Sequence, residues 1–244
     1  GRYAGQPGKQ VRKHVVADLE AQGFLERTDS YLVRLNHSDR SKTPIEPFLA
    51  DQWFVRMEQL AQSAMDAVTS GQVEIIPPRY AKGYLDWLSE KRDWPVGRQL
   101  WWGHQIPIWS RQFASAAERE TAANRLNATA DGQSGRVAVA YEVPDLLHVC
   151  VRSENAALEK RLTAEGYVRQ EDVLDTWFSS ALWPHSTLGW PERTPRLEYF
   201  YPTSVLITSR DIITLWVARM VLMGLNNLGE VPFKKVFIPP KILD

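Results

Sequence analysis

Val205–Ile238, which reads VLITSRDIITLWVARMVLMGLNNLGEVPFKKVFI, decides the fold of this chain. Its apolar start, Val205–Ser209, predicts a strand, and its end, Lys235–Ile238, predicts another. Between them, apolar residues at helical spacing followed by Gly229 predict a helix over about residues 211–227. A strand–helix–strand unit of this length joins two parallel strands, so the sequence predicts an α/β protein with a doubly wound parallel sheet.

Three polar residues follow the first of these strands. Ligands of doubly wound sheets bind in the crevice at the carboxyl ends of the strands, and Ser209, Arg210 and Asp211 stand at that position. Asp211 is therefore a candidate ligand-binding residue. An acidic residue at the start of a helix is equally suited to cap that helix, and the sequence alone leaves both roles open.

The remaining chain predicts further helices and strands. Helices are expected over about residues 9–22, 51–68 (with Asp51 as the capping residue) and 79–90, and strands over Tyr31–Leu35 and Val73–Ile76. Residues 112–170 change character: they begin small, polar and Ala-rich, with an expected flexible stretch at Ala128–Gly135, and end in two strands and a helix. We interpret this stretch as a small α/β insertion.

Composition limits the kind of protein. Lys plus Arg and Asp plus Glu each number 29, so the net charge is zero, and any nucleic-acid contact is expected to be local. The single cysteine, Cys150, excludes an internal disulfide and a cysteine-based zinc site. No apolar run reaches the roughly 18 residues of a membrane span, and the first residues lack the apolar core of a signal peptide. We therefore expect a soluble protein of the cytoplasm.

Tryptophan clusters in two strings that lie far apart in the chain. RDWPVGRQLWWGH spans Arg92–His104, and DVLDTWFSSALWP spans Asp172–Pro184. Large, rigid indole rings beside Gly, Asp and Arg suit the wall of a small-molecule pocket. Any one of these rings could instead belong to the core, because buried aromatic residues dominate cores.

Four segments resemble the class I aminoacyl-tRNA synthetases and, within that class, the valyl branch. They are DRSKTPIEPFLADQWFVRM (Asp39–Met57), RDWPVGRQLWWGHQIPIW (Arg92–Trp109), EDVLDTWFSSALWPHSTLGWP (Glu171–Pro191) and YPTSVLITSRDIITLWVARM (Tyr201–Met220). The resemblance implies the second half of a Rossmann-type sheet with a helical connective region and the small insertion. It divides the chain into residues 1–45, the exit segment of an editing domain; 46–90, the connective region; 91–111 with 171–244, part of the catalytic domain; and 112–170, the insertion.

The resemblance also implies a reaction and its site. Valine and ATP, with Mg²⁺, would form valyl-adenylate, from which valine passes to tRNA. Trp102, Val173 and Trp177 would contact valine. Ser209, Asp211 and Ile238 would contact the nucleotide, although Ser209 and Pro239 stand where the family usually has Gly and His. The HIGH and KMSKS signatures of this family are not in these 244 residues, so we expect an internal piece that contains no catalytic residue and is inactive alone.

Other interpretations of the sequence remain. An isoleucyl-type synthetase would need a pocket with room for one more methylene, and a non-catalytic scaffold or RNA-binding module would need no pocket. Ser179 and Ser180 have no paired His and no G-x-S-x-G motif, so capping or packing is expected of them. The resemblance gives His104 a structural role, because class I adenylation needs no general base. Five His and one Cys show no metal-ligand spacing, so neither zinc nor another metal is expected within this span. We expect Arg92 and Asp93 to form a local ion pair.

Overall fold

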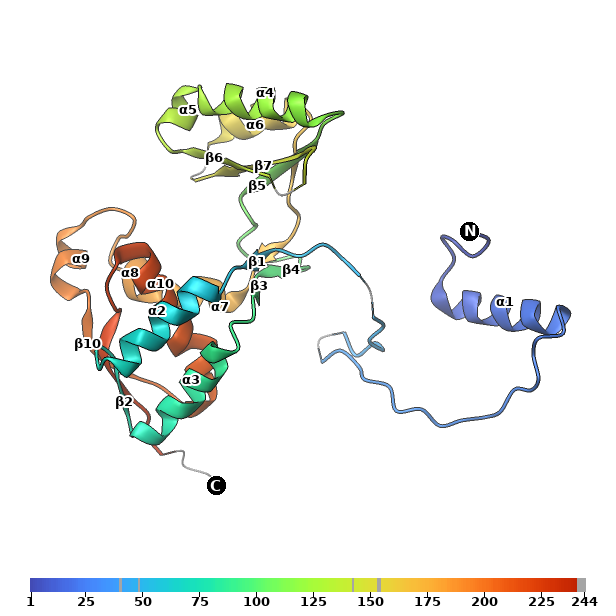
Figure 1. The fold of residues 1–244 in the computed structure, drawn as a ribbon, viewed down its shortest axis with the longest axis horizontal. Coiled ribbons are helices and arrows are strands. Elements are labelled where there is room, and N and C mark those ends of the chain that lie inside the picture. Colours follow the sequence, from blue (N-terminus) through green and yellow to red (C-terminus); the bar gives the residue numbers. More distant parts are fainter. Residues whose placement is uncertain (40, 48, 142, 153–154, 241–244) are drawn as a thin grey trace. The chain divides into compact units, whose positions relative to one another are not determined.

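Three parallel strands form the sheet that the sequence predicts. The computed structural model describes residues 1–39, 41–47, 49–141, 143–152 and 155–240. The strands are β10 (Thr203–Ile207), β11 (Phe233–Phe237) and β2 (Glu74–Ile76), in the order β10-β11-β2 (Figure 1). The chain between β10 and β11 is helical, which confirms the strand–helix–strand unit and the α/β class. The strand at β2 is predicted from the sequence, but it belongs to this sheet rather than to the helical connective region to which the resemblance assigns it.

The helix that joins β10 to β11 is not regular along its length. It begins with a 3₁₀ turn, η2 (Arg210–Ile212), continues as a π-helical turn, η3 (Ile213–Val217), and ends as α10 (Ala218–Leu228). Gly229 closes it with a positive φ of 72°, which is the left-handed conformation expected of a helix C-cap. The predicted boundaries are nearly right, and the wide turn is a departure from the predicted regular helix.

Helices pack over this sheet to make the main hydrophobic core. The helices are α2 (Glu58–Thr69), α3 (Ala81–Ser89, preceded by the 3₁₀ turn η1, Pro78–Tyr80) and α10. Tyr84 is completely buried, and its hydroxyl donates a hydrogen bond of 3.0 Å to the carbonyl oxygen of Ala64. Small residues on the buried face of α2 allow this close packing.

The prediction that a helix begins at Asp51 is wrong, because the chain there is extended. β1 (Phe54–Val55) pairs antiparallel with β3 (Trp94–Pro95), and the amide of Val96 donates to the carbonyl of Trp53. The helix therefore begins only at Glu58. The pairing partner lies some 40 residues further along the chain, where a local pattern does not reveal it.

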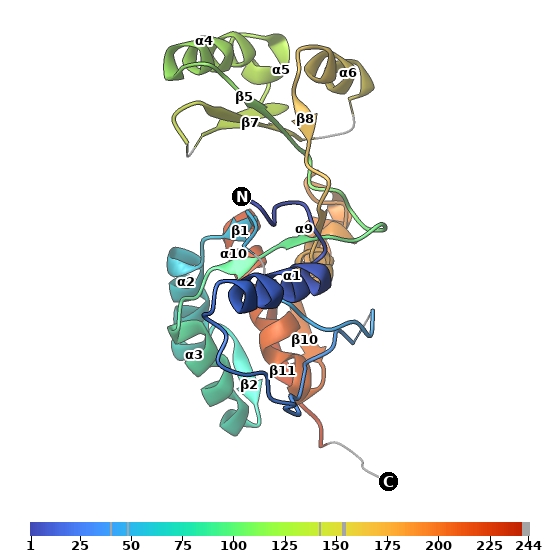
Figure 2. The same ribbon diagram turned by 90° about the vertical axis from the view of Figure 1, so that its right-hand side faces the viewer.

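The insertion has its own antiparallel sheet and core. The strands are β5 (Ile108–Gln112), β6 (Val137–Ala140), β7 (Leu146–Val151) and β8 (Val168–Arg169), in the order β6-β7-β5-β8. The helices α4 (Ala116–Asn127), α5 (Ala130–Gln133) and α6 (Ala156–Ala164) lie on one face of this sheet (Figure 2). The stretch expected to be flexible contains α5. β5 belongs to this sheet, whereas the resemblance assigns residues 108–111 to the catalytic domain.

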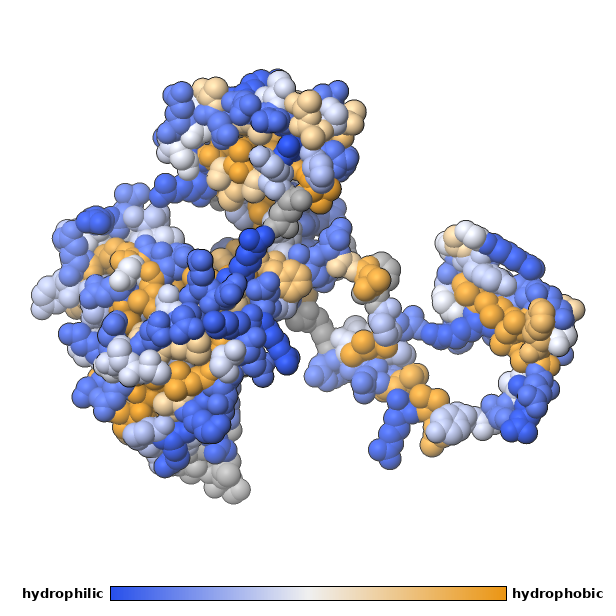
Figure 3. Space-filling model, viewed as in Figure 1, coloured by the Kyte–Doolittle hydropathy of each residue, from blue (hydrophilic) through white to orange (hydrophobic). Residues whose placement is uncertain are grey.

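The first fifty residues form a separate unit. α1 (Gly8–Ala21) matches the predicted helix to within one residue, but none of its residues is buried. Figure 3 shows apolar side chains at the surface of this unit. The predicted strand at Tyr31–Leu35 is wrong: the segment is extended but pairs with no strand among the described residues, and its side chains are exposed. Alternating polarity predicts a strand only where a neighbouring strand completes its hydrogen bonds.

Candidate functional site

A loop at residues 99–104 carries the Trp pair and is closed at its base by a short strand pair. β4 (Gly97–Arg98) pairs antiparallel with β9 (Val173–Leu174), so that Arg98 lies opposite Val173. On the other side of the loop, Gln105 forms a bridge with Val173, and the amide of Leu174 donates to the carbonyl of His104 at 2.7 Å. The two Trp-rich strings of the sequence therefore meet at Val173.

Gly103 brings the loop against Val173 in a way that glycine favours. Its φ is 150°, a backbone conformation that residues with a side chain rarely adopt. A Cβ atom at this position would lie 2.9 Å from Cγ2 and 3.0 Å from Cβ of Val173. The glycine thus has two roles here: it permits the turn, and it leaves space for the Val173 side chain.

A hollow of about 700 Å³ opens beside this contact. Its wall consists of residues from both strings and of the residues that adjoin them: Gln99, Leu100, Trp101, Gly103, Gln105, Glu171, Asp172 and Val173. The amide group of Gln99 donates to the Asp172 carboxylate at 2.9 Å, which ties the loop to the segment before β9. The wall combines apolar side chains with carboxylate and amide groups, and a concave wall of this mixed kind can hold a small molecule.

The structure brings together part of the predicted amino-acid site. Val173 lies at the base of the loop, and the rings of Trp101 and Trp102 are both exposed, at 107% and 91%; Trp101 lines the hollow and Trp102 does not. Trp177 lies on α7 (Thr176–Ala181), half-buried against the main core. No ring contact joins Trp102 to Trp177 among the residues described. The convergence of these two rings on one ligand stays a prediction.

A buried carboxylate directly before α7 was missed by the sequence analysis. Asp175 is 5% exposed and accepts a hydrogen bond of 3.0 Å from the indole Nε1 of Trp94. It also forms ion pairs with Arg98 at 3.3 Å and with Arg219 of α10 at 3.6 Å. Burial lowers the pKa of Arg219, and the charge of Asp175 opposes that change. The available signal was Arg219 itself, a charged residue between Ala218 and Met220 in an apolar helix.

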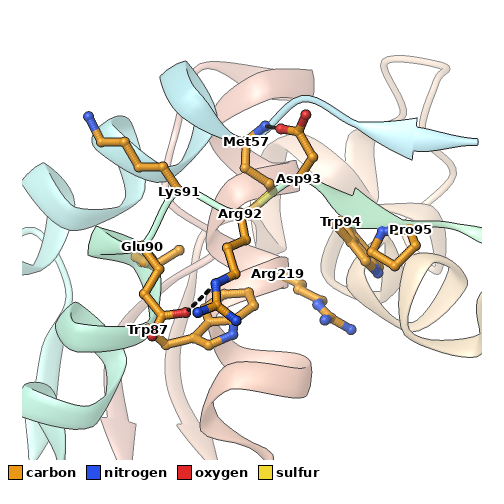
Figure 4. A pocket seen from close by; sticks show the side chains of 10 residues that line it. Met57, Trp87, Glu90, Lys91, Arg92, Asp93, Trp94, Pro95 and Arg219 are labelled. Atoms are coloured by element: carbon orange, nitrogen blue, oxygen red, sulfur yellow. Dashed lines mark hydrogen bonds and ion pairs between the residues drawn. The ribbon is translucent and has the colours of Figure 1, made fainter.

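The expected ion pair between Arg92 and Asp93 is wrong. Arg92 pairs with Glu90 at 3.1 Å, and the Asp93 carboxylate accepts a hydrogen bond from the Met57 amide at 2.9 Å. These residues line a cavity of about 220 Å³ whose far wall includes Trp94 and Arg219 (Figure 4).

The predicted nucleotide residues lie at the carboxyl edge of the parallel sheet. Ile207, Phe237 and Ile76 are in register, so the segments that follow the three strands leave the sheet side by side. Ser209 is the N-cap of η2: its hydroxyl accepts from the Asp211 amide at 3.5 Å and lies 3.3 Å from the Asp211 carboxylate, to which it donates. Asp211 is thus not the capping residue, and its carboxylate is exposed at this edge.

Ile238 follows β11, but its side chain is 1% exposed and belongs to the main core. Its amide donates to the carbonyl of Ile76 at 2.8 Å. At the carboxyl edge of the sheet, Ile238 therefore presents its backbone, whereas its side chain is buried in the core.

Two arginines add positive charge to the same edge. The Arg79 guanidinium lies 4.9 Å from the centre of the Tyr80 ring. A hydrogen bond and the charge of Arg79 and, to a smaller extent, of Arg210 lower the pKa of the Tyr80 hydroxyl, and burial opposes them. Tyr80 follows β2 and Arg210 follows β10, so this interaction shows that the two segments approach each other. The edge combines cations with the Asp211 carboxylate, an arrangement suited to a ligand with phosphate and hydroxyl groups.

Comparison with known proteins decides the family. Residues 10–244 match the family model described as tRNA synthetases class I (I, L, M and V). The chain belongs to the class I tRNA synthetases.

Individual relatives of this class I synthetase chain are valine–tRNA ligases. The chain is 58% identical to the enzyme of Rhodopirellula baltica, over 100% of this chain and 24% of that protein. It is 44% identical to the enzyme of Fervidobacterium nodosum, again over 100% of this chain and 24% of the relative. Among solved structures, a methionyl-tRNA synthetase of Mycobacterium tuberculosis in complex with methionyl-adenylate matches with 13% identity and a TM-score of 0.48, over 84% of this chain and 29% of that one. The chain spans about a quarter of the length of the curated relatives it matches.

Proposed function

We propose that this chain is part of a valine–tRNA ligase and supplies one wall of the amino-acid pocket and the ribose side of the ATP site. The observation that carries the proposal is the 58% identity to a valine–tRNA ligase along the whole chain. The reaction has two steps. The valine carboxylate attacks the α-phosphorus of ATP and pyrophosphate leaves; the adenylate then transfers valine to a tRNA hydroxyl and AMP leaves.

The hollow beside Val173 is the proposed place of the valine side chain. Its wall gains hydrophobic and dispersion energy from a branched aliphatic group, and one methylene more or less is worth about 1–3 kcal/mol in such a pocket. Trp102 and Trp177, which the structure leaves exposed and half-buried, would close over the ligand from the two strings. In this proposal the exposed Trp102 ring is part of the surface that contacts valine.

The carboxyl edge of the sheet is the proposed place of ATP. Asp211 would accept hydrogen bonds from the ribose hydroxyls, Ser209 would orient its carboxylate, and the cations Arg79 and Arg210 would face the phosphates. The backbone at Ile238 would border the adenine. Mg²⁺ is expected with ATP in this family. Among the described residues there is no group of three His, Cys, Asp or Glu side chains that could hold a metal ion.

The remaining features concern the whole enzyme. We propose that tRNA is a substrate, that residues 1–45 are the exit segment of an editing domain, and that the enzyme acts in the cytoplasm. Within the described ranges, every helix is too short or too polar to span a bilayer.

Valine-dependent exchange of pyrophosphate into ATP by the full-length protein tests the proposal. Valine should support exchange, and isoleucine should support it far less. The 244-residue chain alone should be inactive, since it lacks both signatures. Preference for isoleucine would favour the isoleucyl alternative. Absence of exchange with every amino acid, while RNA binding persists, would favour the scaffold module.

Two substitutions in the full-length enzyme test the two halves of the site separately. Trp177→Ala should raise the KM for valine and leave that for ATP nearly unchanged. Asp211→Ala should raise the KM for ATP and leave the KM for valine nearly unchanged. If both variants change both constants equally, the division of the site proposed above is wrong.

A further inference from the structure

Asp175 connects its own segment to two segments that are distant from it in sequence, residues 94–98 and α10. Its side chain contacts Trp94 of β3, Arg98 of β4 and Arg219 of α10. Its backbone amide also donates to the carbonyl of Val96 at 2.8 Å, and its carbonyl accepts from the amide of Phe178 at 2.9 Å. One residue therefore fixes the end of β9, the start of α7, and the strand that leads into the Trp loop.

Asp175 balances the charge of a buried arginine, so its replacement by a neutral residue would leave a buried cation without a counter-ion. Asp175 and Arg219 are both more than nine-tenths buried, and the two arginines outnumber the carboxylate. The guanidinium of Arg219 lies 4.2 Å from the Trp94 ring and 5.6 Å from the Trp87 ring, and its Nε has no hydrogen-bond acceptor. In the cavity of Figure 4, Glu90 pairs with Arg92 and Asp93 accepts from the Met57 amide, and among the described residues Arg219 forms its ion pair with Asp175. Asp175 is thus the carboxylate that stabilises this buried cation.

The position of Asp175 in the chain links this cluster to the amino-acid site. Val173 lies two residues before it, and Trp177 lies two residues after it. A displacement of the Asp175 backbone would move both side chains at once. We propose that Asp175 is a positioning residue for the amino-acid pocket, holding Val173 and Trp177 in place through its contacts with Trp94, Arg98 and Arg219. This inference rests on the proposed function, since it assumes that these two residues contact the substrate.

The test compares Asp175→Asn with Asp86→Asn in the full-length enzyme. Asn keeps the size of Asp175 and an oxygen that can accept from Trp94, but it removes the charge. Asp86, an exposed residue of α3 that pairs with Lys82, is the matched control. Asp175→Asn should raise the KM for valine by about 10- to 100-fold, because small displacements of substrate-positioning groups have effects of that size. The KM for ATP should change less than about threefold, and Asp86→Asn should behave as the wild type.

A double variant separates positioning from folding. Asp175→Asn leaves the Arg219 cation buried without its carboxylate, which destabilises the fold. Adding Arg219→Gln removes that cation, so the double variant should recover thermal stability but not the valine KM. Arg98→Gln, at a half-exposed side chain, removes one contact with less damage and should raise the valine KM by a smaller factor. A double variant that is as stable as the wild type and keeps the wild-type KM for valine would refute the proposal. An Arg98→Gln enzyme with the wild-type KM for valine would refute it as well.

Hydrogen–deuterium exchange gives a readout that does not depend on activity. The amides of Leu174, Asp175 and Phe178 are hydrogen-bonded at this junction, and they should exchange faster in Asp175→Asn than in the control. Unchanged exchange of these amides would refute the positioning role. If the wild-type enzyme lacks valine-dependent exchange of pyrophosphate, only the proposed function fails, and the amide result still decides whether Asp175 fixes this junction.

Discussion

Replacing Gly103 with alanine should weaken the binding of valine without unfolding the protein. The new methyl group would lie 2.9 Å from Cγ2 of Val173, and the backbone φ of 150° is unfavourable for any residue with a side chain. Val173 is buried, so it cannot move away freely. The exposed loop 99–104 can move, so the strain is expected to lift the loop away from Val173.

The magnitude follows from the cost of that conformation. Holding a non-glycine residue in a sparsely populated backbone region costs on the order of 1–3 kcal/mol. If the loop relieves the strain by leaving its binding position, the fraction of molecules that can bind valine falls. The apparent affinity for valine falls in the same proportion. At about 1.4 kcal/mol per factor of ten, valine should bind about 5- to 150-fold more weakly.

The KM for valine in pyrophosphate exchange by the full-length enzyme measures this effect. Gly83→Ala is the matched control, because Gly83 lies on the exposed side of α3 with open space around it. That change should leave the KM unaltered and stabilise the helix by about 0.5–1 kcal/mol. A Gly103→Ala enzyme with the wild-type valine KM would show that contact between the loop and Val173 does not shape the pocket.

Three further substitutions in the full-length protein test packing and titration. Tyr84→Phe removes the hydroxyl that donates to Ala64 and should lower the free energy of unfolding by about 1 kcal/mol in urea; an unchanged midpoint contradicts this. Leu162→Ala, in the core of the insertion, should cost about 2–5 kcal/mol and speed amide exchange in the insertion alone; exchange that rises equally elsewhere would contradict the separate core. Burial lowers the pKa of His185 from 6.5, so the unfolded chain takes up the proton first and stability falls as the pH drops below 6.5. His185→Gln should reduce that loss, and an unchanged pH dependence of the melting temperature would show that His185 does not cause it.

The elements predicted well are those whose determinants are local. Helix α1 and the helix ending at Gly229 each have an apolar repeat and a terminal glycine, and both lie within a residue or two of the prediction. The strands β10 and β11 are short apolar runs on either side of such a helix, which is sufficient to predict their parallel pairing.

The errors occur where distant residues decide the local structure. Trp53–Val55 is extended because Trp94–Val96 pairs with it, and this pairing delays the start of α2. Tyr31–Leu35 has the alternation of a strand but no pairing partner among the described residues. Arg92 forms an ion pair with Glu90 rather than with its neighbour Asp93, because the Asp93 carboxylate accepts a hydrogen bond from the Met57 amide.

The candidate site was predictable in part for the same reason. Sequence alone indicates that the two Trp strings belong together, and the structure joins them at Val173. It does not indicate which indole of the pair lines the hollow, because that depends on the backbone path at Gly103. Nor does it reveal Asp175, whose role depends on partners about 45 to 80 residues away.

The insertion leaves and rejoins the chain at adjacent points. The amide of Gln170 donates to the carbonyl of Ile108 at 2.8 Å, so the two connecting segments run together beside the strand pair that holds Val173. A module attached at such closely spaced ends can be gained, exchanged or lost during evolution without disturbing the scaffold that carries it. Residues 112–167 of the full-length protein could thus be replaced by a tight turn. Comparing the activity and stability of the shortened protein with those of the full-length protein would measure what the insertion contributes.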